Sequence, residues 1–281
     1  MTDLVFLYLL SPLHTGGTTQ EGNLLGIARE SHTNLPYIPS STIRGKIRAS
    51  VSDRITLVKL FGPELKDIQP KDIEDHKFLD DYKLETGKKL TQLEQGDIWI
   101  GDGSLLWLPV PSLSHGVVWV SCPLLLQRWA RFNPYLPEVP APYSTNLSGS
   151  NIYLKDAILK QNELLAWNNW KEFFPQNKVT KSVQRVLLLS DQHCATLVQM
   201  SLWRQVKVKL DQHKSVDGGF RYEEAIPPDT LMYFPWGITS QANGTAEQSK
   251  TDFQDLLSGN EVLQIGGQES LGRGFVQSWL N

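Results

Sequence analysis

The chain has 281 residues, of which 40% are hydrophobic and 20% charged, enough for one large globular domain or two small ones. No apolar run approaches the roughly 20 residues that a membrane helix needs, which argues against a membrane protein. With only two cysteines and a net charge of −3, the sequence predicts neither a disulfide framework nor a cysteine zinc site, fits a reducing cytoplasm, and taken whole argues mildly against nucleic-acid binding.

The chain opens with a predicted strand and a long loop. Residues 3–10 are mostly apolar and predict a strand. Residues 14–39 contain four glycines and two prolines without clear periodicity, so a loop is predicted there. Loops of this length are usually functional or disordered.

A basic amphipathic helix is predicted over residues 40–60. Apolar residues recur every fourth position from Ile43 to Ile55, serines at its start offer N-caps, and Gly62 followed by a proline ends it. Residues 29–54 carry five basic side chains against two acidic ones.

An acidic segment follows this helix. Residues 62–96 are charged and weakly patterned, which predicts an insertion or a partner-binding segment, and residues 62–102 hold eleven carboxylates against six lysines. A basic surface and an acidic surface on one chain would suit a protein that binds RNA in a groove and contacts partner proteins at its flanks. The alternative is that these charged residues are simply scattered over the solvent-exposed surface.

The middle of the chain predicts short strands and two helices. The strands are expected at residues 97–100, 104–108, 117–121 and 184–189, with a linker at 109–116. The helices are expected at residues 123–131, which begin with a proline, and at 152–170, with a Pro/Ser/Asn-rich loop at 133–150 between them.

Residues 203–222 predict a cationic thumb hairpin. Residues 203–210, WRQVKVKL, alternate strictly, which predicts a half-buried strand with a cationic outer face. Its apolar face is Val206, Val208 and Leu210, and its polar face is Gln205, Lys207 and Lys209. Gly218 and Gly219 predict the exposed hairpin tip. Such a hairpin would wedge between nucleotides or lie along their backbone, unless it is a solvated edge strand that its lysines protect from aggregation.

The end of the chain predicts a helix between strands. Strands are expected at residues 229–236, 261–265 and 275–279, with a helix at 246–257 and a glycine-rich loop at 266–274. No tandem repeat occurs. Strands interleaved with helices predict a single α+β domain over residues 1–281, for which a ferredoxin-like or RRM-like β-α-β-β-α-β core is one economical solution.

The start of the basic helix is a candidate phosphate site. A helix N-terminus presents free N–H groups and partial positive charge, here at Ser40 and Ser41. Arg44 and Arg48 are four residues apart and share one face. Gly45 gives up roughly 1 kcal/mol of helix propensity, which makes sense if a phosphate approaches closely. The alternative is an ordinary helix with solvated basic residues.

The glycine-rich loop GGQESLGRG is a second candidate phosphate site. Glycine-rich turns let backbone N–H groups cradle phosphates, here at Gly266 and Gly267, and Arg273 adds a donor. A strand follows the loop, so the spacing is neither a Walker A loop nor a GxGxxG before a helix, and a tight β-turn is the alternative.

Catalytic signals are poor. His14 and His32 are isolated, and such histidines are more often structural. The sequence contains no HExxH and no GxSxG motif, and it predicts no metal site.

Several blocks, in order along nearly the whole chain, resemble the Cmr4 family of the RAMP superfamily. They are IARESHTNLPYIPSSTIRGKIR at residues 27–48, LFG at 60–62, GSLLWLPVPSLSHGVVWVSCPLLLQR at 103–128, YEEAIPPDTLMY at 222–233 and LQIGGQESLGRGFV at 263–276. Each block is modestly specific alone, and the ordered series is what identifies the family.

The resemblance implies a Cas7-like, RRM-derived core with a palm and a thumb, in a backbone subunit of a type III-B CRISPR effector complex of antiviral defence. Copies would stack head-to-tail along the guide RNA, the crRNA, a heterologous contact that builds a filament. Expected partners are crRNA, target RNA, neighbouring copies of the chain and other Cmr subunits, including a Cas10-like large subunit. No contact with a membrane is expected. The expected RNA-binding residues are Arg29, Ser40, Ser41, Arg44, Lys46, Arg48, Lys207, Lys209, Lys214, Arg221, Gly266, Gly267 and Arg273.

The resemblance also implies target-RNA cleavage by an aspartate in the loop before the Arg-Glu-x-His-Thr run. No aspartate lies between residues 14 and 39, where Glu21 and Glu30 are the only carboxylates, and Asn23 or Leu24 takes the catalytic position. We therefore expect a guide-binding subunit with weak or no cleavage and no cofactor. The first alternative is an active endoribonuclease that uses Glu21, or an acid outside the loop, with Mg²⁺. A Cas6-like guide-processing enzyme is the other, and it would need a catalytic histidine near the glycine-rich loop.

Overall fold

A computed structural model describes residues 2–21, 24–242 and 244–280, with the backbone alone for residues 17–21. In its main sheet β1 (Asp3–Leu9) lies between β14 (Leu231–Ile238) and β16 (Phe275–Leu280), antiparallel to both. The first and last strands therefore lie side by side inside the sheet, and β15 lies beyond β16 at its edge. The other strands of this sheet are β4 (Ile98–Ile100), β5 (Ser104–Ser112), β6 (Gly116–Ser121), β7 (Ser144–Thr145), β8 (Ile152–Leu154), β9 (Ala157–Leu159), β10 (Leu165–Ala166), β11 (Val186–Leu188) and β15 (Val262–Gln264).

The main sheet is covered by apolar side chains on both faces. Alternate residues of β1 enter two different clusters: Val5, Leu7 and Leu9 pack in one, and Leu4, Phe6 and Tyr8 in the other. A strand that is buried on both faces is apolar at successive positions, which is why residues 3–10 read as a strand without polar alternation.

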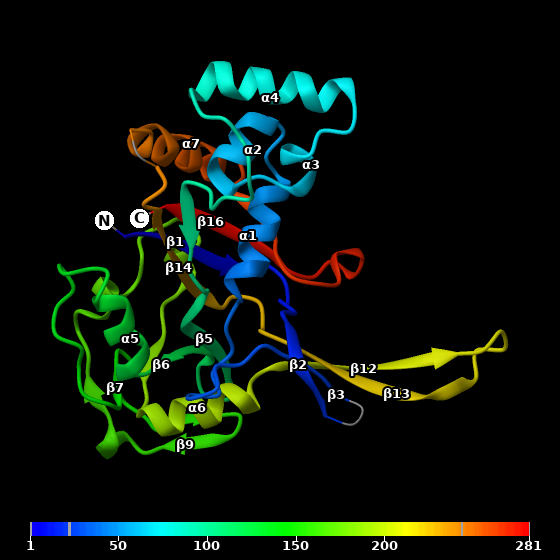
Figure 1. Ribbon diagram of the computed structural model, residues 1–281. Coiled ribbons are helices and arrows are strands. Elements are labelled where there is room, and N and C mark those ends of the chain that lie inside the picture. The colour runs from blue at the N-terminus through cyan, green and yellow to red at the C-terminus, as the bar shows by residue number, and fades with distance from the viewer. Residues whose placement is uncertain (1, 22–23, 243, 281) are drawn as a thin grey trace.

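The helices gather at two ends of the molecule (Figure 1). The segments α2 (Arg54–Phe61), α3 (Leu65–Ile68), α4 (Ile73–Thr86) and α7 (Ala246–Ser258) lie at one end, and α5 (Pro123–Ala130) and α6 (Asp191–Met200) lie at the other. Residues 62–96 build α3 and α4, which pack on α2 through a separate apolar cluster that includes Val58, Phe78 and Tyr82. None of the described helices is long and apolar enough to cross a membrane.

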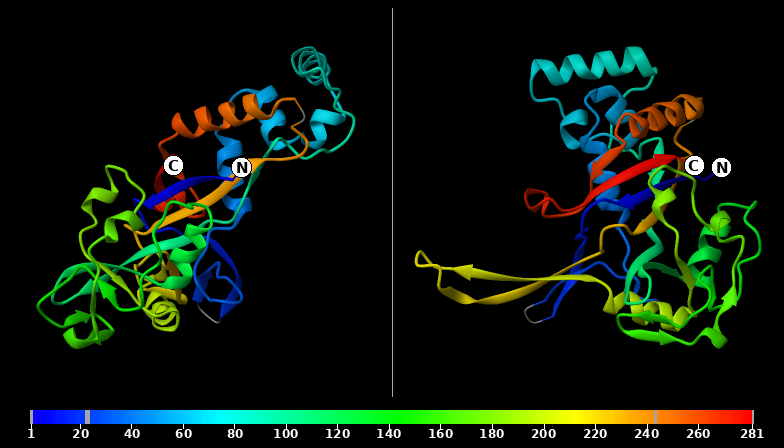
Figure 2. Two further views of the ribbon diagram at one scale, coloured as in Figure 1. Left: turned by 90° about the vertical axis from the view of Figure 1, so that its left-hand side faces the viewer. Right: turned by 180° about the vertical axis from the view of Figure 1, so that it is seen from behind.

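A second sheet carries a long ribbon away from the body (Figure 2). The ribbon is β12 (Trp203–Leu210) with β13 (Val216–Ala225), and we call it the thumb. At its root β13 runs parallel to β3 (Leu24–Ile27), which pairs with β2 (Gly16–Glu21). The four strands have the order β12-β13-β3-β2.

The single helix predicted over residues 40–60 is wrong. The segment forms α1 (Ser40–Ala49) and α2, because the Asp53 side chain accepts a hydrogen bond from the Thr56 N–H at 2.7 Å and starts a new helix. The N-cap of α1 is Pro39, so the serines do not cap it.

Three further element predictions are wrong because strand pairing overrides local pattern. The loop predicted over residues 14–39 contains β2 and β3, and β5 extends to Ser112, into the linker predicted at 109–116. The helix predicted over 152–170 is the β8–β9 hairpin followed by β10 and short 3₁₀ turns, with Leu154 paired to Ser112 of β5. Helix α6 was not predicted.

The thumb also differs from its prediction in two details. Val206 and Val208 belong to the face that was predicted to be buried. They are 49% and 48% exposed, so this face of the strand is open to solvent. The hairpin turn spans residues 211–215, where the Asp211 carboxylate accepts the N–H groups of His213 and Ser215. Gly218 and Gly219 lie inside β13 with positive φ angles of 82° and 95°, beside a register shift, and not at the tip.

Candidate nucleic-acid interface

The two arginines of α1 lie on one helical face, as their spacing predicts. Arg44 donates to the carbonyl oxygen of Phe61, and Arg48 donates to the same oxygen at 3.3 Å and to that of Gly62 at 3.0 Å. Both guanidinium groups thus cover the C-terminal carbonyls of α2, where positive charge is favourable. Burial, with the nearby charge of Arg48, lowers the pKa of Arg44. Since a guanidinium has five N–H donors, Arg44 retains donors for another acceptor.

The first residue of α1 already has a hydrogen-bond partner within the chain, whereas the surface around Gly45 in its middle is open to solvent. The Ser40 N–H donates to a carboxylate oxygen of Asp102 at 2.7 Å, so an acid already meets the helix start where a phosphate was predicted, while Ser41 is exposed. A Cβ at Gly45 would meet no atom within 4 Å, so no contact inside the described chain explains this glycine. Lys46 forms no ion pair within the described residues.

One face of the thumb carries cations that are mostly paired. Lys207 and Arg221 reach Glu223 at 2.8 and 3.0 Å, and Lys209 reaches Asp217 at 2.9 Å. The side chains of Lys209 and Arg221 remain 76% and 61% exposed. Lys214 lies in the turn and has no ion pair in the part of the chain that the structure describes.

The other face of the thumb is apolar and uncovered. The register places Val206 opposite Tyr222, Val208 opposite Phe220 and Leu210 opposite Val216. These six side chains are 42–63% exposed, and the rings of Phe220 and Tyr222 meet edge to face with centroids 5.6 Å apart. A contiguous apolar strip of this kind marks a surface that meets a partner.

Arg273 lies against the root of the thumb and not on the surface. It is 3% exposed, and its two Nη atoms donate to Glu223 at 3.0 Å and to Gln205 at 2.7 Å. The guanidinium also lies over the Trp203 ring, 4.5 Å from its centroid. The sequence predicted a phosphate donor here, and the structure places this group inside the protein.

The glycines of the loop pack against the chain itself. Gly266 and Gly274 have positive φ angles of 80° and 78°, and a Cβ at these positions would collide with the carbonyl oxygens of His14 and Ile265. The Gly267 N–H donates to the His14 carbonyl at 3.0 Å. The tight-turn alternative therefore accounts for the loop without a ligand.

Arg29 lies in a groove of about 740 Å³ beside the thumb root. Its Nη2 is 2.6 Å from one carboxylate oxygen of Glu224, and Arg204 is 2.9 Å from the other. Glu224 is 1% exposed, and its carbonyl oxygen lies 2.7 Å from Nδ1 of His14. A buried carboxylate thus holds two arginines at the wall of a groove, and His14 has the structural contact expected of an isolated histidine.

The family resemblance implies a catalytic residue in the loop before Arg29, and described residues of this segment line the same groove. Leu24 begins β3 and lines the groove, and Glu21 ends β2. Asn23 lies outside the described residues, as does the side chain of Glu21. Among the side chains that are described, no three His, Cys, Asp or Glu gather as a metal-ligand set.

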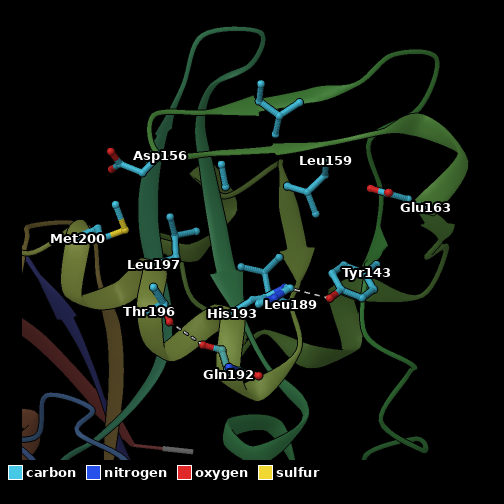
Figure 3. Close-up of a pocket in the computed structure, with 12 residues that line it drawn as sticks. Tyr143, Asp156, Leu159, Glu163, Leu189, Gln192, His193, Thr196, Leu197 and Met200 are labelled. Carbon is cyan, nitrogen blue, oxygen red and sulfur yellow. Dashed lines mark hydrogen bonds between the residues drawn. The ribbon is translucent and has the colours of Figure 1, made fainter.

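A second cavity, of about 550 Å³, lies between α6 and the β8–β9 hairpin (Figure 3). Leu159, Leu189 and Leu197 give it apolar walls, and Tyr143 Oη lies 3.0 Å from Nδ1 of His193 at its edge. None of the predicted RNA-binding residues lines it, so it lies outside the predicted interface.

Sequence reasoning missed the adjacent buried carboxylates Glu223 and Glu224. Each faces a different side of β13, and each collects cations from another part of the chain. The available signal was a Glu-Glu pair in a strand close to several basic residues. Their burial depends on the β12–β13 register and on distant loops, which the sequence does not specify.

A model of the RAMP superfamily matches residues 6–277. The chain is also 26% identical over 300 residues to the CRISPR system Cmr endoribonuclease Cmr4 of Pyrococcus furiosus. That similarity covers 98% of this chain and 94% of the relative.

Solved structures share the fold. The crystal structure of oligomeric Cmr4 from Pyrococcus furiosus has a TM-score of 0.68 at 22% identity, and it covers 100% of this chain and 97% of that one. A chain of the type III-B Cmr-beta complex bound to cognate target RNA has a TM-score of 0.74 at 18% identity, with the same coverage. At these identities the likeness establishes the fold, and it confirms the predicted α+β, Cas7-like RAMP core. Because the family model spans nearly the whole sequence, this chain belongs to the RAMP superfamily, and within it the predicted resemblance to Cmr4 is confirmed.

Proposed function

We propose that the chain is a crRNA-binding backbone subunit of a type III-B CRISPR effector complex. The observation that carries the proposal is the amphipathic thumb, which projects from a Cmr4-like fold beside a groove walled by Arg29 and Arg204. The relative is a Cmr endoribonuclease, and one structure with this fold is a Cmr complex bound to target RNA.

Helix α1 grips guide phosphates in this proposal. Arg44 keeps free guanidinium donors, Lys46 has no ion pair among the described residues, and the open surface at Gly45 lets a sugar–phosphate backbone approach the helix. These contacts are to phosphates and not to base edges, so binding should not depend on guide sequence.

The thumb meets the guide–target duplex. Lys209, Lys214 and Arg221 place positive charge on its outer part, and Phe220 and Tyr222 offer aromatic faces to unstacked bases. Neighbouring copies of the chain and other Cmr subunits, including a Cas10-like large subunit, complete the complex. Residues 62–96 are a candidate surface for one of them.

Target cleavage by this subunit is weak or absent. Phosphodiester cleavage commonly uses a metal held by carboxylates, and Asn23 or Leu24 offers no negative charge to recruit Mg²⁺. A metal-dependent endoribonuclease that uses Glu21 is the second candidate function, favoured by the activity in the relative's name.

The proposal is tested with single-stranded RNAs of unrelated sequence and increasing length. We expect equal affinity per site, a linear fall of log K with log salt, and more bound copies on longer RNA, counted by mass photometry. Lys46→Ala should reduce the salt slope by roughly 0.7, the value for one phosphate contact on a single strand. The matched control Lys155→Ala, in the exposed β8–β9 turn, should leave it unchanged. Binding to one sequence alone, or one copy on RNA of every length, would contradict the proposal.

A further inference from the structure

We propose that Arg273 is a positioning residue that fixes the direction of the thumb, and not a ligand of guide phosphates. The proposal rests on the proposed function only in its last step, the engagement of target RNA. Its structural part concerns this chain alone.

Arg273 joins the main sheet to both strands of the thumb. It comes from the loop between β15 and β16, reaches Glu223 of β13 at 3.0 Å and Gln205 of β12 at 2.7 Å, and lies over Trp203 of β12. We call these contacts the root bridge. A guanidinium that donates to two strands and stacks on a ring is held in one orientation, because its donors form a rigid planar fork.

The root bridge differs from the other ion pairs of Glu223. Lys207 and Arg221 also contact this carboxylate, but both belong to the thumb, whereas Arg273 belongs to the body. Burial alone would raise the pKa of Glu223, but the hydrogen bond and charge of Lys207, with the charge of Arg273, outweigh it and hold the pKa below its ordinary value. The side chain of Glu223 is therefore a carboxylate at neutral pH.

The loop that carries Arg273 is itself fixed to the segment that follows β1. The N–H groups of Gly267 and Gly274 donate to the carbonyls of His14 and Pro12, a few residues after the end of β1. At Gly266 a side chain would collide with the His14 carbonyl. A continuous series of short contacts thus runs from β1 through the glycine-rich loop and Arg273 to the thumb.

Loss of Arg273 should loosen the thumb without undoing the rest of the site. Lys207 and Arg221 would still neutralise the Glu223 carboxylate, so no buried charge is left alone. Helix α1, the proposed guide grip, makes none of the root-bridge contacts. Guide binding and target engagement should therefore separate.

The structural part is tested by the distance between two spin labels, at Ser215→Cys on the thumb turn and Ser258→Cys on the body. Both positions are exposed, and the native Cys122 and Cys194 are buried and should not react. We expect a narrow distance distribution in the otherwise unaltered protein and a broad one with Arg273→Met. The matched control Lys207→Met also removes one cation from Glu223, but within the thumb, and should stay narrow. Arg273→Lys keeps the charge without the planar fork and should be intermediate. An unchanged distribution in Arg273→Met would overturn the proposal.

The functional part uses guide and target RNA with the same variants. Arg273→Met should keep the affinity and salt slope for guide RNA and lose roughly tenfold in affinity for target, because a loose thumb must be ordered on binding. If Arg273→Met reduces the salt slope of guide binding, Arg273 is a phosphate ligand and the proposal is overturned. The proposal is also overturned if Arg273→Met broadens the label distances but leaves the affinity for target RNA unchanged, because Arg273 then has no role in target engagement. If the unaltered protein binds no guide RNA, the proposed function fails, while the label distances still decide whether Arg273 fixes the thumb.

Discussion

Two adjacent residues after β3, Arg29 and Glu30, contact different parts of the molecule, the thumb root and helix α5. Arg29 reaches Glu224 at the thumb root, and Glu30 accepts hydrogen bonds from Arg128 of α5 at 2.6 and 3.0 Å. Glu30 and Arg128 are 16% and 17% exposed, so removing one partner leaves a charge that water solvates poorly. The orientation of the groove wall therefore depends on single residues.

Glu30→Gln should destabilise the protein at neutral pH and matter less in acid. Burial raises the pKa of Glu30, but the hydrogen bonds from Arg128 and Thr33 outweigh it and lower the pKa below its ordinary value of 4.5. A carboxylate with a lowered pKa contributes stability above its unfolded pKa, and this contribution is lost as the pH falls through the folded pKa. We expect a cost of about 1–3 kcal/mol at pH 7 in urea unfolding. The difference from the unaltered protein should narrow as the pH falls below 4.5, and a constant difference would contradict this reading.

Arg44→Ala and Arg48→Ala should have different effects. Arg48 is bound to two carbonyls and to Glu64, so its loss should mainly lower the unfolding temperature. Arg44 has a single acceptor within the described chain, so its loss should also flatten the salt dependence of RNA binding by roughly 0.7. Calorimetry and RNA titration of both variants measure the two effects. Equal loss of RNA affinity in both would show that Arg48 contacts RNA as well.

At the scale of elements, local signals predicted some segments and misled at others. The proline start of α5 and the alternation of β12 are local signals, and they predicted the helix and the strand, although not the exposure of β12 on both faces. Ser50 to Asp53 separate α1 from α2 although the apolar spacing continues through Val51, and Asp53 as an N-cap was a readable signal. The segment 152–170 carried no such signal, because its strands form only by pairing with β5 and with each other.

A shortened thumb should leave the body folded. The outer residues of β12 and β13 pair with each other and are exposed on both faces, so replacing residues 209–219 with Asn-Gly between Val208 and Phe220 makes a two-residue hairpin. We expect an unchanged unfolding temperature, retained guide binding and lost target engagement. Val208→Thr with Phe220→Thr keeps the length and removes apolar surface, so it separates the contribution of the apolar face. A large fall in unfolding temperature would mean that the outer thumb packs on the body.

At the scale of the whole molecule, the ordered sequence blocks predicted the fold better than any single element. The family resemblance ran along the chain, and the RAMP match and Cmr4-like structures confirm it. The charged root of the thumb was not predictable, because residues 29, 204, 223, 224 and 273 meet only after the two sheets form. Arg273 was therefore predicted as a phosphate donor, although its partners within the chain bury it.

The assembled complex should cleave target RNA weakly at the positions set by this subunit. We expect little regular cleavage with Mg²⁺ in the unaltered complex, and cleavage gained with Asn23→Asp or Leu24→Asp, because either restores a carboxylate that can recruit the metal. Electrophoresis of end-labelled target measures the spacing of the products. Regular cleavage by the unaltered complex that disappears with Glu21→Ala would establish the alternative function.

The length of the thumb makes it a lever. Its first strand has eight residues, which at about 3.3 Å per residue places the turn roughly 26 Å from the root. A rotation of about 10° at the root would move the turn by roughly 4.5 Å, which exceeds the roughly 3.4 Å per nucleotide along one strand of double-stranded DNA, taken here as the length scale of a duplex. A small angular change at the root is thus enough to shift the turn by about one nucleotide. In a row of stacked copies, the regular spacing of contacts along the RNA would then depend on how stiffly each lever is mounted.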